Sequence, residues 1–574
     1  MKRKILPVLF AIVLILIIGG IAVLGYLKDK YSYGTQLADL NEYFGVSGEG
    51  EAAIVLQDTL LEKKAVIRDG ICYFDLDTVC EYLNEVFYFD RGENLLLYTN
   101  AAETISTRIG ESVYTDTTGS HEMKHPISYL EGDTLYLLAD FVKLYTNYSY
   151  EVFDRQVQLY TQWGSRQVAD VKKDTQLREK GGIKSPILRE LQAGDTVEIL
   201  EQMETWSKVK SEDAIIGYVE NKRLDNQRSE EEIPVTDYQA PEYTGIAMEG
   251  KVSLGWHSIG GVGGNDTLET VVAGAKGMNV IAPTWFSLND NEGGFRSFAT
   301  AAYVTRAHAY GLQVWGVLDD FNYANETKTD IDVYAVLSST TNRQKLAENI
   351  TDVAVSLGLD GINLDFERVG SDSGIHYVQF LRELSVLCRQ KGLVLSVDNY
   401  VPFHFNEYYR LDIQGQVADY VIIMGYDEHW HGSKDPGSVA SIDYVANGIK
   451  RTVEQVPANK VINALPFYTI VWAIEGAKVT DEYLTLNNTE DFIKRIGIKP
   501  VWDDTTCQNY MEWTSGSKTY RVWLEDAKSI SAKLNVMNAN NIGGVAAWRL
   551  GYGTPAVWEL INAYVNSAGQ TAAK

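Results

Sequence analysis

Cysteine is scarce in this sequence, with four among 574 residues and no Cys-x-x-Cys pair. Disulfide frameworks and structural zinc sites both need several closely spaced thiols, so neither is predicted. Cys72 and Cys80 could form a single bridge outside the cytoplasm, but four free or buried thiols are the simpler expectation. His429 and His431 have no third ligand at a suitable spacing, so we expect loop histidines and no metal site.

Positive charge is also in short supply. The sequence has 51 Lys and Arg against 77 Asp and Glu, a formal net charge of -26. Phosphate backbones are bound by clustered Lys and Arg, so nucleic acid is excluded as a partner. The sequence also has no GxGxxG or GKS/T run at the ends of its strand-like segments, and we predict no cofactor.

A long apolar run stands at the N-terminus. After MKRK, residues 5–27 are uncharged and just long enough to cross a bilayer as a helix. A cleaved signal peptide is the alternative, but its apolar region is usually shorter, and AVLGYL is a poor cleavage site. The basic residues at positions 2–4 favour a cytoplasmic N-terminus. We therefore predict an anchor over residues 1–30 and an extracytoplasmic body, with secretion as the alternative.

Residues 31–162 are predicted to form a small α+β module. Residues 31–60 lead into it, and short alternating runs such as ICYFDLDTV and RQVQLYTQ follow, separated by turn residues. The repeated strand and helix units resemble the copper amine oxidase N-terminal-like domain of exported bacterial proteins. The resemblance implies a spacer or wall-contacting role, and no metal, since His121 and His125 are the only histidines there.

Residues 166–224 contain five short strand-like runs with a Gly-Asp turn, a Trp in the following hairpin and a closing GYV strand. In that order these features resemble a bacterial SH3 domain, and any small β-barrel is the alternative. The resemblance implies either contact with the peptide stems of cell-wall polymers or a spacer. Residues 225–243 are acidic and polar with two prolines, which predicts an exposed linker.

Residues 245–574 alternate apolar strand-like runs with helix-period segments. This pattern predicts a (β/α)8 barrel, with a doubly wound open sheet as the alternative. The longest gap precedes the last run, so we expect an α+β insertion at about residues 470–530. The runs are KVSLGWH, MNVIAPTWFSL, LQVWGVLDDF, DGINLDFE, LVLSVDNYVP, YVIIMGYDEHW, VINALPFYT and GGVAAWRL.

One of these runs carries three polar residues on one face. In DGINLDFERV, Asn363, Asp365 and Glu367 alternate with apolar residues and therefore project to the same side of a strand. Buried carboxylates are costly unless they are hydrogen-bonded or neutralised. The stretch is thus either a surface strand or a site, and the other polar groups at the strand ends favour a site.

The carboxyl ends of barrel strands carry the active site in this architecture. Acids, amides and aromatic rings gather there, a mixture typical of a carbohydrate site. Trp256 could be a sugar platform or barrel core, Asp319 and Asp320 are expected to cap the next helix, and Glu525 stays unassigned. The other residues at these ends are His257, Trp285, Asn399, Tyr400, Tyr426, Asp427, Phe467, Tyr468, Trp548 and Arg549.

Three motifs, in order across residues 245–565, resemble family 18 glycoside hydrolases. DGINLDFE resembles the DGxDxDxE signature, MGYDEHW the sixth-strand M-x-Y-D motif, and GGVAAWRL the eighth strand ending in Trp. The resemblance implies substrate-assisted catalysis, in which the acetamido oxygen of the substrate attacks the anomeric carbon. Glu367 would be the general acid, Asp365 would stabilise the oxazolinium ion, and Tyr426 would hold the acetamido oxygen. Asp360 and Asn363 would support the motif, and the implied substrate-binding residues are Trp285, Asn399, Met424, Asp427 and Trp548.

Asn363 departs from the signature, which most often has Asp there. Asn cannot ionise, so Asp365 is expected to stay a carboxylate more of the time and the pH optimum to shift. The DGxNxDFE form, with APTWFSL and AWRLG, most resembles a bacterial subgroup that includes spore-cortex N-acetylglucosaminidases. Members of that subgroup usually carry LysM modules, and this chain has an SH3-like module and an anchor instead.

The expected function is a membrane-anchored, retaining hydrolase that cuts β-1,4 bonds at N-acetylglucosamine in peptidoglycan or a related polymer. Its expected partners are that polysaccharide, the cell wall through the SH3-like module, and the membrane through residues 5–27. A non-catalytic glycan-binding barrel and a chitinase for external chitin are the alternatives. Glu367, Asp365 and Tyr426 together favour an enzyme, because a lectin needs no proton donor.

Overall fold

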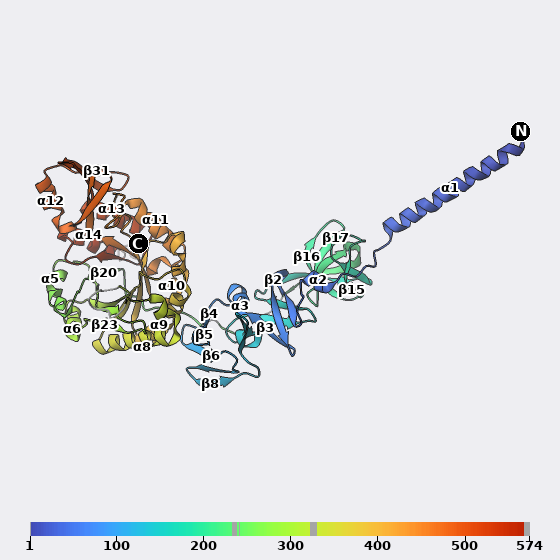
Figure 1. Ribbon diagram of the computed structural model, residues 1–574, viewed down its shortest axis with the longest axis horizontal. Coiled ribbons are helices and arrows are strands. Elements are labelled where there is room, and N and C mark those ends of the chain that lie inside the picture. Colours follow the sequence, from blue (N-terminus) through green and yellow to red (C-terminus); the bar gives the residue numbers. More distant parts are fainter. Residues whose placement is uncertain (1, 232–237, 240, 322–329, 568–574) are drawn as a thin grey trace. The chain divides into compact units, whose positions relative to one another are not determined.

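The computed structural model describes residues 2–231, 238–239, 241–321 and 330–567. The chain divides into two compact units, which we describe separately. The first comprises residues 1–87, 107–115 and 120–240, and the second comprises residues 88–106, 116–119 and 241–574. Figure 1 shows the succession of elements along the chain.

The chain begins with one long helix, α1 (Lys2–Tyr31). The segment Pro7–Tyr31 has a mean hydropathy of 3.1 over its most apolar part and is long enough to cross a membrane. At 1.5 Å per residue it would span about 37 Å, against about 30 Å for a hydrocarbon core. The predicted apolar helix is therefore confirmed.

A seven-stranded sheet forms the first module, in the order β11-β12-β1-β2-β3-β10-β9. The strands β1, β3 and β12 are buried on both faces over most of their length. Asp75 caps the helix that follows β3 with its side chain. The elements are α2 (Leu40–Phe44), β1 (Glu51–Leu56), β2 (Thr59–Arg68), β3 (Ile71–Asp75), α3 (Leu76–Tyr82), β9 (Ser128–Glu131), β10 (Thr134–Leu138), α4 (Ala139–Lys143), β11 (Ser149–Val152) and β12 (Gln156–Tyr160). All four cysteines of the chain lie in described segments and are free thiols.

The second module is also a seven-stranded sheet, in the order β15-β14-β18-β17-β16-β13-β19. Its last strand pairs with its first from Ser165 opposite Glu231 to Val171 opposite Leu224. Residues 225–231 are therefore strand, and the predicted linker is wrong there; residues 232–237 and 240 lie outside the described residues. The strands are β13 (Ser165–Val171), β14 (Thr175–Arg178), β15 (Ile187–Leu191), β16 (Thr196–Gln202), β17 (Trp206–Ser211), β18 (Ile216–Glu220) and β19 (Leu224–Glu231).

The second unit contains a closed barrel of eight parallel strands. Its strand order is β21-β20-β34-β28-β27-β26-β25-β24, and β21 also pairs with β24. That pairing closes the sheet and excludes the doubly wound alternative. The strands are β20 (Val252–His257), β21 (Val280–Pro283), β24 (Gln313–Asp319), β25 (Gly361–Asp365), β26 (Val394–Tyr400), β27 (Tyr420–Met424), β28 (Val461–Pro466) and β34 (Gly544–Trp548).

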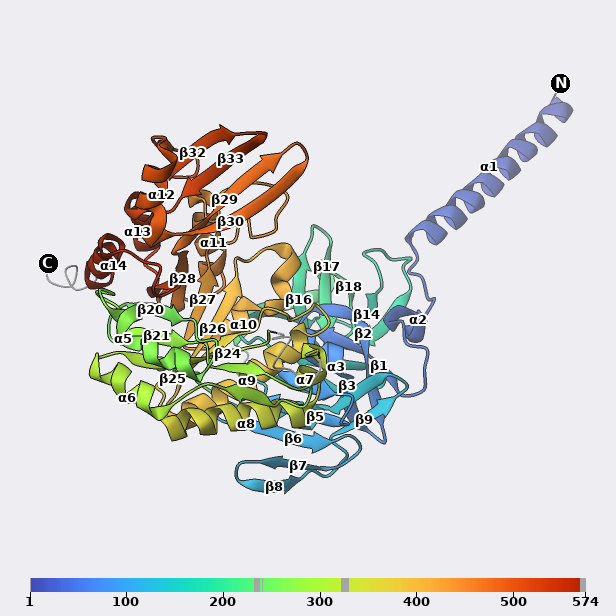
Figure 2. The ribbon, with the colours of Figure 1, turned by 60° about the vertical axis from the view of Figure 1, so that its left-hand side comes forward.

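Helices cover the outside of the barrel, and Figure 2 shows α8 and α9 side by side below its strands. Ser339 caps the start of α8, and Gly358 ends it in the left-handed conformation at φ 76°. The helices are α5 (Leu268–Val272), α6 (Ala301–Ala309), α7 (Val333–Ser338), α8 (Thr340–Leu357), α9 (Gly374–Lys391), α10 (Leu411–Val417), α11 (Ile442–Val453), α13 (Ala527–Ala539) and α14 (Pro555–Asn566). The short strands β22 (Phe286–Leu288) and β23 (Phe295–Ser297) extend the sheet.

An inserted subdomain separates the last two barrel strands, as predicted. Its sheet has the order β30-β29-β33-β32-β31, drawn in orange in Figure 1. Phe492, Met511 and Val522 form part of its own small core. The elements are β29 (Tyr468–Glu475), β30 (Lys478–Thr485), α12 (Thr489–Ile496), β31 (Val501–Asp503), β32 (Gln508–Ser515) and β33 (Lys518–Leu524).

Residues 88–106 belong to the compact unit of the barrel, although the catalytic domain was predicted to begin at residue 245. The carboxylate of Asp90 accepts hydrogen bonds of 2.6 Å from the backbone N–H and hydroxyl of Thr340, the first residue of α8. Gln379 on α9 donates to the Thr99 hydroxyl at 2.9 Å. Asp90 lies at the end of β4 (Phe87–Asp90) and Thr99 at the end of β5 (Leu95–Thr99). The same sheet continues with β6 (Thr104–Arg108), β7 (Val113–Asp116) and β8 (Gly119–Glu122).

Candidate active site

A cavity of about 220 Å³ opens at the carboxyl ends of the barrel strands. Six of the residues predicted for the site line it, namely Asp365, Glu367, Met424, Tyr426, Asp427 and Trp548. Strand alternation explains the clustering, because β25 and β27 each turn the same parity of residues toward the mouth. Trp256, Phe321, Asp398 and Tyr400 complete the lining.

The two carboxyl groups of the signature are strongly desolvated. Burial, reinforced by the charge of Glu367, raises the pKa of Asp365 well above its ordinary value. Burial also raises the pKa of Glu367, against a hydrogen bond from Tyr400 that lowers it. Two neighbouring carboxylates in a desolvated site cannot both ionise easily, so the pair holds a proton at a pH where a free carboxyl would be charged.

Asp320 fixes the backbone beneath Glu367. Its two carboxylate oxygens accept hydrogen bonds from the backbone N–H groups of Glu367 at 3.0 Å and Arg368 at 2.9 Å. Burial raises the pKa of Asp320 to about 7, although these N–H groups oppose the shift. The expectation that Asp320 caps the next helix is wrong, because the next described helix, α7, is capped by Asp332.

Asn363 bridges two other groups of the cavity. Its side-chain oxygen accepts a hydrogen bond from the Trp256 indole at 2.9 Å, and its N–H₂ group donates to Asp398 at 2.8 Å and to Ser396 at 3.0 Å. Asn363 is fully buried, so its amide satisfies both neighbours without adding a charge. Asn363, the residue that departs from the signature, is therefore hydrogen-bonded to Asp398, a further acid that lines the cavity.

Asp398 is the residue that sequence reasoning missed. It lies on β26 with the same parity as Ser396 and Tyr400, so the three project to one face of the strand. Strand parity therefore predicts that Asp398 faces the mouth, whereas our prediction names Asn399. Asn399 faces the other way and exchanges hydrogen bonds with Gln414 at 2.7 and 2.8 Å. The prediction that Asn399 binds substrate is therefore wrong.

Trp285 is the other predicted substrate contact that lies elsewhere. Its ring is 0% exposed, and its indole N–H donates to Asn265 at 2.8 Å. The ring packs edge-on against Tyr303, which makes Trp285 part of the barrel core and corrects the prediction. Asp360 lies at the opposite end of β25 and accepts a hydrogen bond of 2.8 Å from the Val314 backbone, so it joins two strands.

Aromatic and polar groups shape the remaining walls. The rings of Trp256 and Trp548 meet edge to face, with centroids 6.0 Å apart. Tyr468 from the insertion donates a short hydrogen bond to Asp427. Burial raises the pKa of Asp427, and this hydrogen bond opposes the shift. Glu525 lies away from the cavity, in a buried ion pair of 2.7 Å with Lys533.

A second hollow, of about 810 Å³, shares Glu367, Tyr400, Tyr426 and Asp427 with the cavity and continues toward α11. Phe405 and Trp430 line it with 76% and 57% of their surfaces exposed. Large exposed rings beside a buried acid suit a polymer of sugars, whose apolar faces stack on them. The whole site is therefore a short deep cavity that opens into a longer groove.

The comparisons with known proteins agree with this geometry. Residues 326–553 match the model of glycosyl hydrolases family 18, and residues 173–225 match the bacterial SH3 domain. The chain thus carries a family 18 glycoside hydrolase domain and a bacterial SH3 domain. The resemblance of residues 31–162 to a copper amine oxidase N-terminal-like domain stays a prediction.

Among curated relatives, the uncharacterized glycosylase YvbX of Bacillus subtilis is 26% identical over 293 residues, covering 50% of this chain and 84% of that protein. A cortical fragment-lytic enzyme of Bacillus anthracis is 27% identical over 236 residues, covering 39% of this chain and 54% of that enzyme. The chain therefore spans only about half of the second relative. Among solved structures, the C-terminal domain of a putative chitinase from Desulfitobacterium hafniense superposes with a TM-score of 0.50 at 17% identity, covering 55% of this chain and all of that domain, which supports the barrel fold.

Proposed function

We propose that this chain is an extracytoplasmic glycosidase that cuts β-1,4 bonds at N-acetylglucosamine in peptidoglycan, with retention and with the substrate as nucleophile. The observation that carries the proposal is the meeting of Asp365, Glu367 and Tyr426 in one desolvated cavity. Each of the three has a chemical task there, and a binding barrel would have no use for a buried acid such as Glu367.

The reaction begins when the acetamido carbonyl oxygen of the bound sugar attacks its anomeric carbon. As that bond forms, the glycosidic C–O bond breaks and the leaving oxygen takes the proton of Glu367. Asp365 accepts a hydrogen bond from the acetamido N–H and offsets the positive charge of the oxazolinium ion. Tyr426 holds the acetamido oxygen in line, and Trp548 lies against the sugar.

The second half of the reaction uses the same acid in reverse. Ionised Glu367 takes a proton from water, and the resulting oxygen nucleophile attacks the anomeric carbon from the face that the leaving group had occupied. The bond to the acetamido oxygen breaks, which restores the acetamide and leaves the β configuration. Net consumption is one water for each bond that is cut.

Three features favour peptidoglycan over chitin. The relative from Bacillus anthracis is named for lysis of cortical fragments. The bacterial SH3 domain fits contact with the cell's own wall. The N-terminal apolar helix, retained as an anchor, would hold the barrel beside that wall. A chitinase for external polymer would gain nothing from such a tether.

The test is digestion of purified peptidoglycan and of chitin oligomers by the full chain in detergent micelles, with mass analysis of the new ends. We expect fragments that end in reducing N-acetylglucosamine from peptidoglycan, and loss of almost all product in Glu367→Gln. The proposal fails if Glu367→Gln releases as much product as the natural chain. Preference for chitin oligomers would overturn the substrate alone.

A further inference from the structure

The groove that continues from the active-site cavity toward α11 has a definite place in the proposed reaction. Glu367, Tyr400, Tyr426 and Asp427 line both the cavity and the groove, whereas Trp548 lines only the cavity. The acid must lie beside the glycosidic oxygen that it protonates, so the bond that is cut lies at these shared residues. Since the cavity takes the sugar with the reacting acetamido group, the groove takes the part of the polymer that leaves.

The groove contains a single positive charge. Arg451 on α11 is the one basic residue among the described residues that line it, and the acids beside it are Glu367, Asp427, Glu428 and Asp443. The whole chain has a formal net charge of -26, so its field repels an anionic polymer. Arg451 is therefore the position in the groove that would attract a negative group of the substrate.

Uncharged neighbours hold the guanidinium of Arg451 in place. It lies over the ring of Phe403, 4.7 Å from the ring centre, and donates a hydrogen bond of 3.0 Å to the Pro402 carbonyl. Phe403 in turn stacks on Phe405, with the ring centroids 5.5 Å apart. A guanidinium has five N–H groups, so this one hydrogen bond leaves most of its donors for a ligand.

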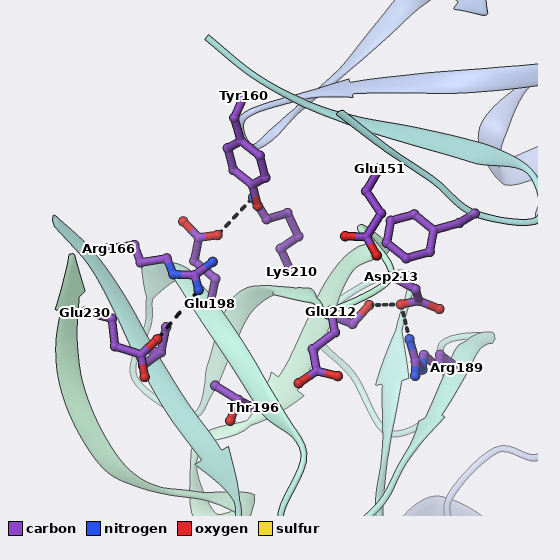
Figure 3. A pocket seen from close by; sticks show the side chains of 13 residues that line it. Glu151, Tyr160, Arg166, Arg189, Thr196, Glu198, Lys210, Glu212, Asp213 and Glu230 are labelled. Carbon is purple, nitrogen blue, oxygen red and sulfur yellow. Dashed lines mark hydrogen bonds and ion pairs between the residues drawn. The ribbon is translucent and has the colours of Figure 1, made fainter. Parts of the chain in front are cut away.

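The cations that line another hollow of the chain differ from Arg451 in having acidic partners. In the first unit, a hollow of about 740 Å³ is lined by three basic residues, and Figure 3 shows them among carboxylates. Their ion pairs are Lys210 with Glu198, Arg166 with Glu230 and Arg189 with Asp213. Arg451 forms no ion pair with any residue that the structure describes. Its charge is therefore available to a substrate.

A short series of contacts joins Arg451 to the reacting end of the groove. The hydroxyl of Tyr444 donates to the Tyr426 carbonyl at 3.4 Å, and the rings of Tyr444 and Phe403 have centroids 6.3 Å apart. Arg451 lies on Phe403, so two aromatic rings separate it from Tyr426. A group that meets Arg451 would thus belong to a side arm of the leaving sugar and not to the bond that is cut.

We propose that Arg451 determines specificity by binding a carboxylate on a side arm of the leaving sugar. The inference rests on the proposed function, because it requires the groove to hold the leaving part of the polymer. A planar guanidinium fits a carboxylate through two parallel hydrogen bonds. Chitin has no such group, whereas every second sugar of peptidoglycan has a lactyl arm with a carboxylate or with a peptide that carries carboxylates. Arg451 would therefore favour the acidic polymer.

The test compares three soluble oligomers that differ only in the arm of the leaving sugar. One has a free lactyl carboxylate, one has the dipeptide Ala-Glu attached to it, and one has an uncharged lactyl methylamide. Steady-state kinetics of the full chain in detergent micelles should give a KM about five- to tenfold lower for a charged arm than for the methylamide. The kcat should be similar, because Arg451 would bind substrate and transition state equally. The charged arm with the lower KM identifies the source of the carboxylate.

Arg451→Gln should abolish this preference, and Arg451→Lys should keep part of it. On the methylamide oligomer Arg451→Gln should react like the natural chain, which shows that the variant folds. Arg495→Gln is the matched control and should keep the full preference. Arg495 on α12 is also an exposed arginine near a ring, 5.4 Å from the centre of Phe492, but it does not line the groove.

Equal KM values for charged and uncharged arms in the natural chain, or a preference that survives Arg451→Gln, would overturn the proposal. Calorimetric binding of the same oligomers to Glu367→Gln, with and without Arg451→Gln, separates this inference from the proposed function. A binding preference that depends on Arg451, without hydrolysis by the natural chain, would support the inference and count against the proposed function alone. Binding of no oligomer would overturn both.

Discussion

Residue-scale chemistry centres on how the chain keeps Glu367 both buried and correctly placed. Burial, with the nearby charges of Asp427 and Asp319, raises the pKa of Glu367, and Asp320 holds the backbone of the turn that carries Glu367. Asn363 adds an uncharged bridge between Trp256 and Asp398. The groups around Glu367 are thus both charged and uncharged, and they lie at different distances from the reacting atoms.

Asp320→Asn should lower kcat by about 10- to 100-fold, because an amide nitrogen in place of one oxygen would face a backbone N–H and shift Glu367. KM should change little, since Asp320 does not line the cavity. Steady-state kinetics on a soluble glycan oligomer measures both. Asp352→Asn, at an exposed position on α8, is the matched control. An unchanged kcat would refute the positioning role.

Asn363→Asp should destabilise the fold, and more so as pH rises. The new carboxyl would lie beside Asp398, where Asn363 now donates at 2.8 Å, so burial and repulsion would raise the folded-state pKa of the pair. A raised acid pKa means that the folded state holds more protons than the unfolded one, so stability falls with increasing pH. Thermal unfolding at about pH 5 and about pH 8 tests this, and a deficit that is larger at low pH would contradict it.

Sequence reasoning found most of the cavity because strand parity is local information. Asp365, Glu367 and Tyr426 could be placed on one mouth from alternation and motif order alone. Two predicted substrate contacts were wrong. One did not follow strand parity, and the other depends on contacts with residues distant in the sequence. The prediction names Asn399, one position from Asp398. The position of Trp285 in the core depends on Asn265 and Tyr303, which come from other elements.

At the scale of elements, the barrel unit includes a segment from far upstream. Residues 88–106 supply Asp90 and Glu93 to the first turn of α8, where free backbone N–H groups need acceptors. Arg343 on α8, which is 0% exposed, pairs with Glu383 on α9 at 3.0 Å and donates to the Tyr88 hydroxyl at 3.1 Å. No periodicity in the sequence predicts contacts between segments separated by about 250 positions.

Asp90→Ala should lower the free energy of unfolding of the barrel unit by about 1–3 kcal/mol, because the buried N–H and hydroxyl of Thr340 would lose their acceptor. Chemical denaturation followed by tryptophan fluorescence measures the change. Asp77→Ala, at a position whose side chain is 84% exposed, is the control and should be neutral. Equal stability of the two variants would show that this segment contributes little.

At the scale of the whole molecule, the chain joins an apolar helix, a bacterial SH3 domain and a family 18 glycoside hydrolase domain. The helix predicts that the protein stays with membranes after a high-salt wash, with residues 1–30 intact when its N-terminus is determined by mass spectrometry. The reason is that the apolar segment Pro7–Tyr31 is long enough to span, and burying it in lipid outweighs electrostatic release. A soluble form that begins after this segment would establish a cleaved signal instead.

The central claim is that the substrate's own acetamido group is the nucleophile and Glu367 the acid. The most direct measurement is the configuration of the freshly formed reducing end, followed by proton NMR during cleavage of a soluble N-acetylglucosamine-containing oligomer. The β anomer should appear first, and an oligomer without the acetamido group at the cleaved sugar should not react. First appearance of the α anomer, or cleavage at a sugar that lacks the acetamido group, would contradict the mechanism.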